Sequence, residues 1–208
     1  MAKVDFGKKK AIFQGFQIFK KHLKFILGVY LIVIAISLGR FSVNFATGNN
    51  QLIELSLIVN MILGVLSIIV SIGAAKVFLN VIDEKALKFS DLFKEYQYFF
   101  SFLLASIVNG ILVVIGFIAL IVPGIFFALR YQYFLFVMVE KKTGAMESLY
   151  LSEKVTRGNL TNLFLFNLLV LGINILGLLC FVVGLFITVP VTTLASVWVY
   201  RQLAKSNF

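Results

Sequence analysis

Three charged stretches divide this chain, and each is followed by two long apolar runs that an uncharged connector joins. The hydrocarbon core of a bilayer is about 30 Å thick, so a helix rising about 1.5 Å per residue needs about 20 mostly apolar residues to cross it. Six runs come close to that length, at 25–44, 52–82, 98–122, 124–139, 160–187 and 190–203. The pattern predicts an all-α, polytopic membrane protein with six transmembrane helices in three hairpins.

Composition supports a membrane environment. Hydrophobic residues make up 61% of the chain and charged residues 13%, and the mean hydropathy is +1.01. A soluble domain of 208 residues cannot hide so much apolar side chain. The runs are continuous and do not alternate at period two, which favours helices over the strands of a membrane barrel.

The distribution of positive charge predicts the orientation. Most of the 19 Lys and Arg residues lie in the N-terminal tail, the two internal charged stretches and the C-terminal end, whereas the connectors 46–51, 120–124 and 184–189 contain none. Loops rich in Lys and Arg stay in the cytoplasm. We therefore expect a multi-pass protein of the cell (cytoplasmic) membrane with both termini in the cytoplasm.

The chain also has an internal repeat. We expect a single integral membrane domain, 1–208, built from three units at about 1–82, 83–141 and 142–208, in which a cytoplasmic interfacial helix precedes each hairpin. Solvated loops whose charges only set the topology are the alternative. The expected apolar faces are Ile12, Phe13, Phe16, Phe19 and Leu23 in the first unit, Phe89, Leu92, Phe93, Tyr96 and Phe100 in the second, and Met146, Leu149 and Tyr150, interrupted by Glu153, in the third.

Lysines of the first unit are candidate lipid contacts. A cation near an anionic membrane surface contributes about 1 kcal/mol to binding. We expect membrane lipids with anionic headgroups on the cytoplasmic side as partners, and a membrane-protein partner is also compatible with the sequence. Because the positive-inside pattern accounts for the net charge of +10, no nucleic-acid partner is expected. The predicted headgroup contacts are Lys8, Lys9, Lys10, Lys20, Lys21 and Lys24.

Ionisable residues within apolar runs are costly and point to specific partners. Arg40 and Glu54 lie at the outer ends of the first two runs, so a short hairpin would bring them to similar depth. A salt bridge between them is one interpretation. The other is that both side chains simply reach the outer headgroups.

Arg130 is predicted to lie deeper, because it follows Pro123 by seven residues. Tyr131 and the amides of Asn60, Asn109 and Asn174 fall at intermediate depth and are its candidate partners. This intramembrane polar cluster has two interpretations. It either fixes helix packing through interhelical hydrogen bonds or lines a cavity for an anionic group.

Short motifs concentrate between 122 and 159. They are Val122-Pro123-Gly124-Ile125, Arg130-Tyr131, Val139-Glu140, Gly144-Ala145-Met146-Glu147-Ser148-Leu149 and Ser152-Glu153-Lys154-Val155-Thr156-Arg157-Gly158-Asn159. The stretch resembles the integral-membrane domain found ahead of some bacterial glycerophosphodiester phosphodiesterases, and related stand-alone bacterial membrane proteins of unknown function. The resemblance implies a helical membrane module and not the hydrolase. A phosphodiesterase barrel takes about 250 residues and clustered metal ligands, whereas this chain has one histidine.

The sequence shows no metal-ligand cluster, nucleophile motif or phosphate-binding loop. We therefore expect no catalytic residues, no cofactor and no metal. The expected function is that of a non-catalytic membrane module that interacts with lipid or protein. The alternative is a small-solute or ion transporter with a polar site around Arg130.

Overall fold

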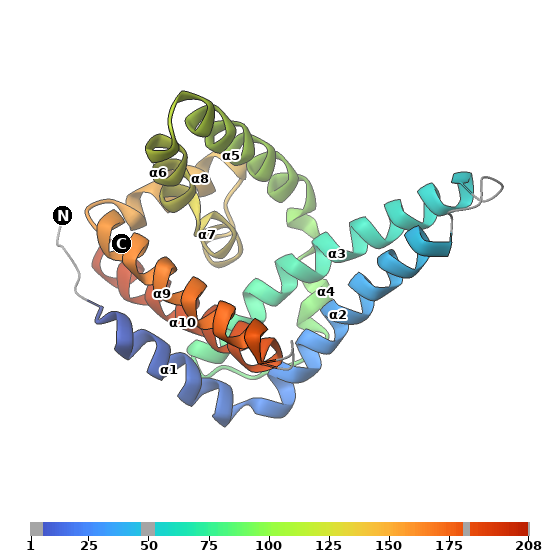
Figure 1. The fold of residues 1–208 in the computed structure, drawn as a ribbon, viewed down its shortest axis with the longest axis horizontal. Coiled ribbons are helices and arrows are strands. Elements are labelled where there is room, and N and C mark those ends of the chain that lie inside the picture. Colours follow the sequence, from blue (N-terminus) through green and yellow to red (C-terminus); the bar gives the residue numbers. More distant parts are fainter. Residues whose placement is uncertain (1–5, 47–52, 181–183, 208) are drawn as a thin grey trace.

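A computed structural model of the chain describes residues 6–46, 53–180 and 184–207, which form helices and short connections without a strand (Figure 1). The helices are α1 Lys8–Lys21, α2 Leu23–Ala46, α3 Ile53–Ile82, α4 Asp91–Lys94, the 3-10 helix η2 Tyr96–Tyr98, α5 Phe99–Ala119, α6 Ile121–Tyr131, α7 Phe134–Lys141, α8 Ala145–Thr156, α9 Leu160–Leu179 and α10 Leu185–Asn207. The all-α fold class predicted from the sequence is confirmed for these residues.

Five helical stretches are long and apolar enough to cross a membrane, which indicates a membrane protein. They correspond in place to the first five predicted runs. The predicted sixth run, 190–203, lies within α10, which does not meet the same criterion of length and composition. The five stretches are Leu23–Val43, Ser56–Ile82, Asp91–Ala119, Ile121–Lys141 and Leu160–Leu179.

Helix α10 contributes many of the buried side chains of the molecule. It begins at Leu185, so Pro190 lies inside it and does not open it as the predicted boundary required. Its side chains supply much of the largest core cluster, in which Leu194, Tyr200 and Leu203 are fully buried. It packs against α1, α2, α3, α8 and α9. The least apolar of the predicted spans is therefore the one that the other helices cover.

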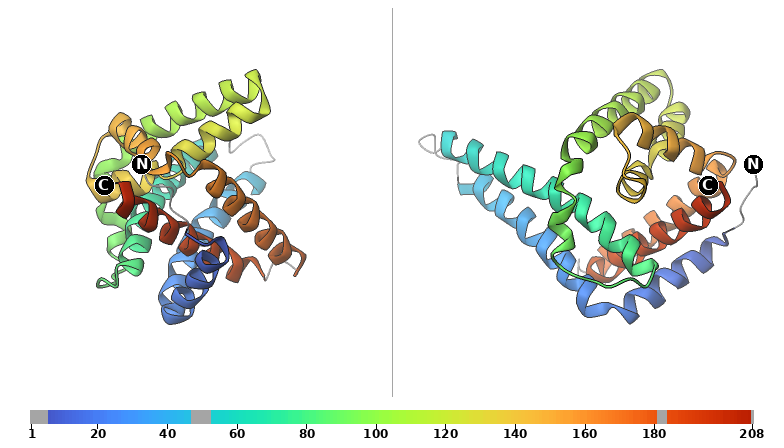
Figure 2. Two further views of the ribbon diagram at one scale, coloured as in Figure 1. Left: turned by 90° about the vertical axis from the view of Figure 1, so that its left-hand side faces the viewer. Right: turned by 180° about the vertical axis from the view of Figure 1, so that it is seen from behind.

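Consecutive long helices pack in pairs: α2 with α3, α5 with α6, and α9 with α10. Figure 1 shows the α2–α3 pair extending away from the other helices. In the left view of Figure 2, the α5–α6 and α9–α10 pairs extend toward the same side, while the C-terminal end of α10 lies on the other. Glycines permit close approach near two of the turns, because a Cβ on Gly116 would lie 2.8 Å from Gly124 Cα and one on Gly184 2.4 Å from the carbonyl oxygen of Gly177.

The predicted fourth run, 124–139, is broken into α6 and α7. Helix α8 satisfies the backbone groups that the break leaves free. The Tyr133 amide donates to Ser152 Oγ at 3.2 Å, and the hydroxyls of Ser152 and Thr156 donate to the carbonyl oxygen of Arg130 at 3.2 and 3.0 Å. Such partners make a discontinuous helix tolerable in an apolar environment.

The three predicted interfacial segments differ. The first is the full helix α1, while the second is reduced to α4 and η2. In the third, α8, the predicted apolar face is divided: Leu149 is buried against the protein, but Met146 and Tyr150 are exposed. Its buried face also includes the hydroxyl residues Ser148, Ser152 and Thr156, because these satisfy backbone groups.

Candidate functional site

Helix α1 packs against α10, but part of the apolar surface of α1 remains exposed. Ala11, Gly15 and Phe19 are buried, whereas Phe13 and Phe16 are exposed. The apolar face predicted from the sequence is therefore divided between two environments. The small residues Ala11 and Gly15 let α1 approach α10 closely. The exposed rings of Phe13 and Phe16 form an apolar surface that can contact a lipid or another protein.

Two open apolar grooves border the crossing of α1 and α10. One, of about 400 Å³, runs between α1, α9 and α10 and is lined by Phe13, Phe16 and the side chain of Lys9. The other, of about 450 Å³, runs between α1, α2 and α10. Ile187 lines both grooves. We call them the α1 grooves.

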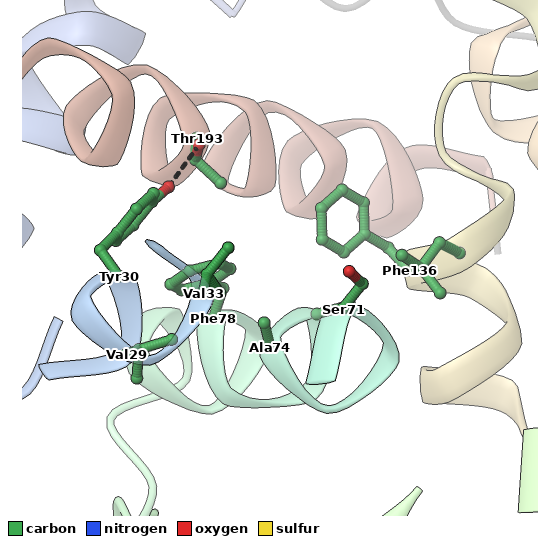
Figure 3. Close-up of a pocket in the computed structure, with 10 residues that line it drawn as sticks. Val29, Tyr30, Val33, Ser71, Ala74, Phe78, Phe136 and Thr193 are labelled. Carbon is green, nitrogen blue, oxygen red and sulfur yellow. Dashed lines mark hydrogen bonds between the residues drawn. The ribbon is translucent and has the colours of Figure 1, made fainter. Parts of the chain in front are cut away.

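A third cavity, of about 250 Å³, opens between α2, α3, α7 and α10 (Figure 3). Its lining is mainly apolar, and Phe78 and Phe136 contribute rings to it. The Tyr30 hydroxyl donates a hydrogen bond of 2.8 Å to Thr193 Oγ1 at one end. Tyr30 also lines the α1 groove beside α2, so the three cavities follow one another around the first half of α10.

The lysines predicted to contact lipid all lie on or next to α1. Lys8 is half-buried, and the other five are exposed. Lys20 lies over the ring of Phe16 at 5.2 Å from its centre, and Lys9 borders an α1 groove. Lys21 is different, because it forms an ion pair with Glu84 at the end of α3. The structure thus combines free apolar surface and positive charge on one helix.

Arg130 is paired with an acid that the sequence reasoning did not consider. Its guanidinium donates to the Glu153 carboxylate on α8 and lies over the Phe126 ring at 5.4 Å. Both charged side chains are mostly buried, with 29% and 24% of their surfaces exposed. The signal for this pair was present in the sequence: Glu153 interrupts the apolar face of the third interfacial segment.

The other members of the predicted cluster lie on separate helices. Asn174 on α9 and Thr192 on α10 are 3.4 Å apart. The carbonyl oxygen of the Asn109 side chain on α5 is buried without a hydrogen-bond partner among the described residues. Asn60 is half-buried on α3, and Tyr131 stacks on Phe127. The Asn174–Thr192 contact joins two helices, whereas Tyr131 and Phe127 lie on the same helix, α6.

Arg40 and Glu54 are both exposed, near the C-terminal end of α2 and the N-terminal end of α3. The ion pairs within the described ranges do not join them. The pairs that tie distant helices together lie elsewhere. Arg201 on α10 binds Asp83, which follows α3, and Glu140 on α7, and the Tyr200 hydroxyl donates to the same Glu140. This network also escaped sequence reasoning, because its members are far apart in the chain.

The described residues also show which ligands the cavities around α10 suit. Within residues 6–46, 53–180 and 184–207, groups of three or more His, Cys, Asp or Glu that could hold a metal ion do not occur. Three of these cavities have mainly apolar walls with one to three hydroxyl groups, which suits a ligand with long hydrocarbon chains.

Comparison with known proteins adds no relative. No protein-family model, no curated protein and no solved structure matches the chain. The resemblance of residues 122–159 to the membrane domain of some phosphodiesterases therefore stays a prediction.

Proposed function

We propose that this protein is a non-catalytic integral membrane module that binds phospholipid. The acyl chains occupy the α1 grooves, and the anionic headgroup lies against the exposed lysines of α1. The observation that carries this proposal is the groove in which Lys9 stands beside Phe13 and Phe16. A cation at the rim of an apolar groove matches the two parts of an anionic lipid.

The proposal includes a topology. Six spans form three hairpins in the cell membrane, each preceded by a segment at the cytoplasmic surface, and both termini face the cytoplasm. Support comes from the lysine-rich segments and the uncharged connectors. The burial of α10 fits a sixth span that protein surrounds, because a covered helix does not need a fully apolar surface.

Cysteine labelling tests the topology. In a Cys180→Ser background, single cysteines at Lys88 and Lys205 should react with a membrane-impermeant maleimide in inside-out vesicles and stay unlabelled in intact cells. Both positions are exposed in the structure, so access to reagent is not limited by the fold. Labelling of either position from outside the cell would contradict the orientation.

A substitution that fills the α1 grooves tests lipid binding. Ile187→Trp places a large ring where the two grooves meet, and Ile175→Trp on α9 is the matched control, since the two isoleucines are 50% and 49% exposed. Native mass spectrometry of protein purified in mild detergent should detect retained phospholipid in the wild type and the control. We expect Ile187→Trp to retain less than about half as much, because the added volume excludes an acyl chain.

A second pair of variants tests the headgroup contact. Lys9→Gln should lower the share of anionic lipid among the retained molecules about threefold, whereas Lys88→Gln should not change it. Wild-type protein that retains no phospholipid, or an Ile187→Trp variant that retains as much as the wild type, would contradict the proposed function.

Transport of a small solute ranks second. That alternative requires Arg130 to be available to an anionic solute, whereas Glu153 occupies its guanidinium. The pair instead supports a role for Arg130 in holding α6 against α8.

A further inference from the structure

A polar pocket of about 260 Å³ lies where the ends of α1 and α3 meet the C-terminal half of α10. It differs from the α1 grooves, because charged and amide groups make up much of its wall. Six ionisable side chains line it, and both signs of charge are present. They are Lys21, His22, Asp83, Glu84, Arg201 and Lys205.

The charges are divided by element. The basic side chains come from the end of α1 and from α10, and the two carboxylates come from the residues that follow α3. Lys21 pairs with Glu84, and Arg201 binds Asp83 at 2.6 Å. The Lys21–Glu84 pair is exposed, with 58% and 72% of the two side chains accessible. Exposed pairs are weak, so a ligand that offers both charges can replace it.

Glu84 stands where the backbone favours glycine. Its φ of 54° is left-handed, and the Lys85 amide donates to the carbonyl oxygen of Asn80 across it, as in the glycine-terminated ends of many helices. A side chain in this conformation is strained. The hydrogen bond from Lys21, its charge and that of His22 lower the pKa of the Glu84 carboxyl, which therefore stays ionised. The chain thus has a glutamate at a position where the backbone conformation favours glycine.

The wall of the pocket that α10 forms has a donor without a partner. The terminal nitrogens of Arg201 bind Asp83 and Glu140, but its Nε is buried without a hydrogen-bond partner among the described residues. Lys205 is exposed at the rim, and Trp198 contributes the indole ring. Donors and positive charge on this wall suit a phosphate, while an indole and carboxylates suit an ammonium group.

We infer that this pocket binds a zwitterionic phosphate ester, in which one group carries the phosphate and a short arm carries an ammonium. The phosphate faces Lys21, Arg201 and Lys205, and the ammonium faces Glu84 and Asp83. A simple anion fits less well, because two carboxylates share the pocket and would repel it. The headgroup of phosphatidylethanolamine and free phosphoethanolamine offer this same chemistry, and the lipid source rests on the proposed membrane function.

Tryptophan fluorescence gives a direct test, since Trp198 lines the pocket and is the only tryptophan in the chain. Phosphoethanolamine added to the purified full-length protein in detergent should change the Trp198 emission in a saturable way. Inorganic phosphate alone and ethanolamine alone should bind about tenfold more weakly, because each carries charge of one sign only. Phosphate that binds as tightly as phosphoethanolamine, or the absence of any saturable change, would overturn the inference.

Substitutions at two exposed residues distinguish the ammonium contact from the phosphate contact. Glu84→Gln should weaken phosphoethanolamine binding about three- to tenfold. The same variant should strengthen the binding of phosphate alone, because it removes a repelling carboxylate and frees Lys21. Lys205→Gln should weaken the binding of both compounds. Lys94→Gln, on α4 outside the pocket, is the control. Thermal unfolding confirms that each variant is folded. A Glu84→Gln variant that binds phosphoethanolamine as the wild type does would overturn the assignment of the ammonium site.

Nanodiscs identify the source of the ligand. Emission that differs between nanodiscs of phosphatidylglycerol alone and nanodiscs with an equal part of phosphatidylethanolamine assigns the site to a lipid headgroup, and a response to soluble phosphoethanolamine alone assigns it to the free compound. Lipid retention in the α1 grooves is measured separately through Ile187→Trp. If the grooves retain lipid but Trp198 never responds, the pocket inference fails and the proposed function stands.

Discussion

Gly15 of α1 lies against Val191 of α10 so closely that a Cβ at Gly15 would be 2.5 Å from the Val191 carbonyl oxygen. It would also lie 2.8 Å from the amide nitrogen of Ala195. Both atoms are backbone and cannot turn aside as a flexible side chain can. This contact fixes α1 on α10 and thereby sets the width of the α1 grooves.

Gly15→Ala should therefore lower the free energy of unfolding by about 1–3 kcal/mol, because the added methyl forces α1 and α10 apart. Gly172→Ala on α9 is the matched control: its Cβ would meet nothing within 4 Å. Alanine is the better helix former by about 1 kcal/mol, so the control should be as stable as the wild type or more stable. Thermal unfolding in detergent measures both. A Gly15→Ala protein as stable as the Gly172→Ala control would contradict the close contact.

The fold was predictable from the sequence where the hydrophobic pattern alone decides it. The runs at 25–44, 52–82 and 98–122 correspond to helices because their length and apolarity leave few alternatives. The break between α6 and α7 was not predictable, because it depends on Ser152 and Thr156 reaching Arg130 from another helix. Hydropathy carries no information on such tertiary hydrogen bonds.

The site was predictable in part. The lysines and phenylalanines of α1 are visible in the sequence, but the division between buried Phe19 and exposed Phe16 depends on where α10 lies. The partner of Arg130 was not predictable from depth along the predicted spans alone. Glu153 approaches from α8, a segment expected at the membrane surface.

Ser152→Ala should destabilise the protein by about 1–3 kcal/mol. The variant leaves the Tyr133 amide at the break without the hydroxyl that accepts from it, and an unsatisfied buried donor costs about that much. Ser37→Ala is the control, because the Ser37 hydroxyl is exposed and bonds only to Val33 within its own helix. We expect the control to change the free energy of unfolding by less than about 0.5 kcal/mol. Equal effects of the two substitutions in denaturant titrations would show that α8 does not support the break.

Arg130→Met should lower the free energy of unfolding by about 2–3 kcal/mol, because it leaves Glu153 charged and largely buried without its partner. Glu153→Gln should cost a similar amount for the same reason. If the two side chains act as a pair, the double variant should cost clearly less than the sum of the single variants. Additive costs in this cycle would mean that Arg130 has another partner.

Lys94→Met provides the contrast for that cycle. Lys94 pairs with Asp91 at 2.8 Å, but 61% of its side chain is exposed. Exposed pairs contribute about 0–1 kcal/mol, so this substitution should have little effect on unfolding. If Lys94→Met lowered the free energy of unfolding as much as Arg130→Met does, burial would not explain the difference in strength expected between the two ion pairs.

Glu84 should also give the protein an acid-dependent component of stability. A carboxyl whose pKa is lower in the folded state stabilises the protein above its unfolded pKa, and this contribution disappears as the pH falls through the folded pKa. Glu84→Gln lacks this contribution at every pH. The wild type should melt at a higher temperature at neutral pH, and the difference between the two proteins should shrink on acidification. A constant difference between the two proteins from neutral to acidic pH would contradict the ion pair with Lys21.

Glu84→Gly distinguishes the effect of the backbone conformation on stability from the effect of the carboxylate on ligand binding. Glycine adopts the left-handed conformation without strain, so this variant should melt at a higher temperature than Glu84→Gln, although both lack the ion pair with Lys21. If the carboxylate serves ligand binding, the glycine variant should nevertheless respond to phosphoethanolamine as weakly as the glutamine variant does. Parallel melting curves and Trp198 titrations measure the two properties. A glycine variant that melts below the glutamine variant would show that the conformation at this position is not strained, and the carboxylate would then need no functional explanation.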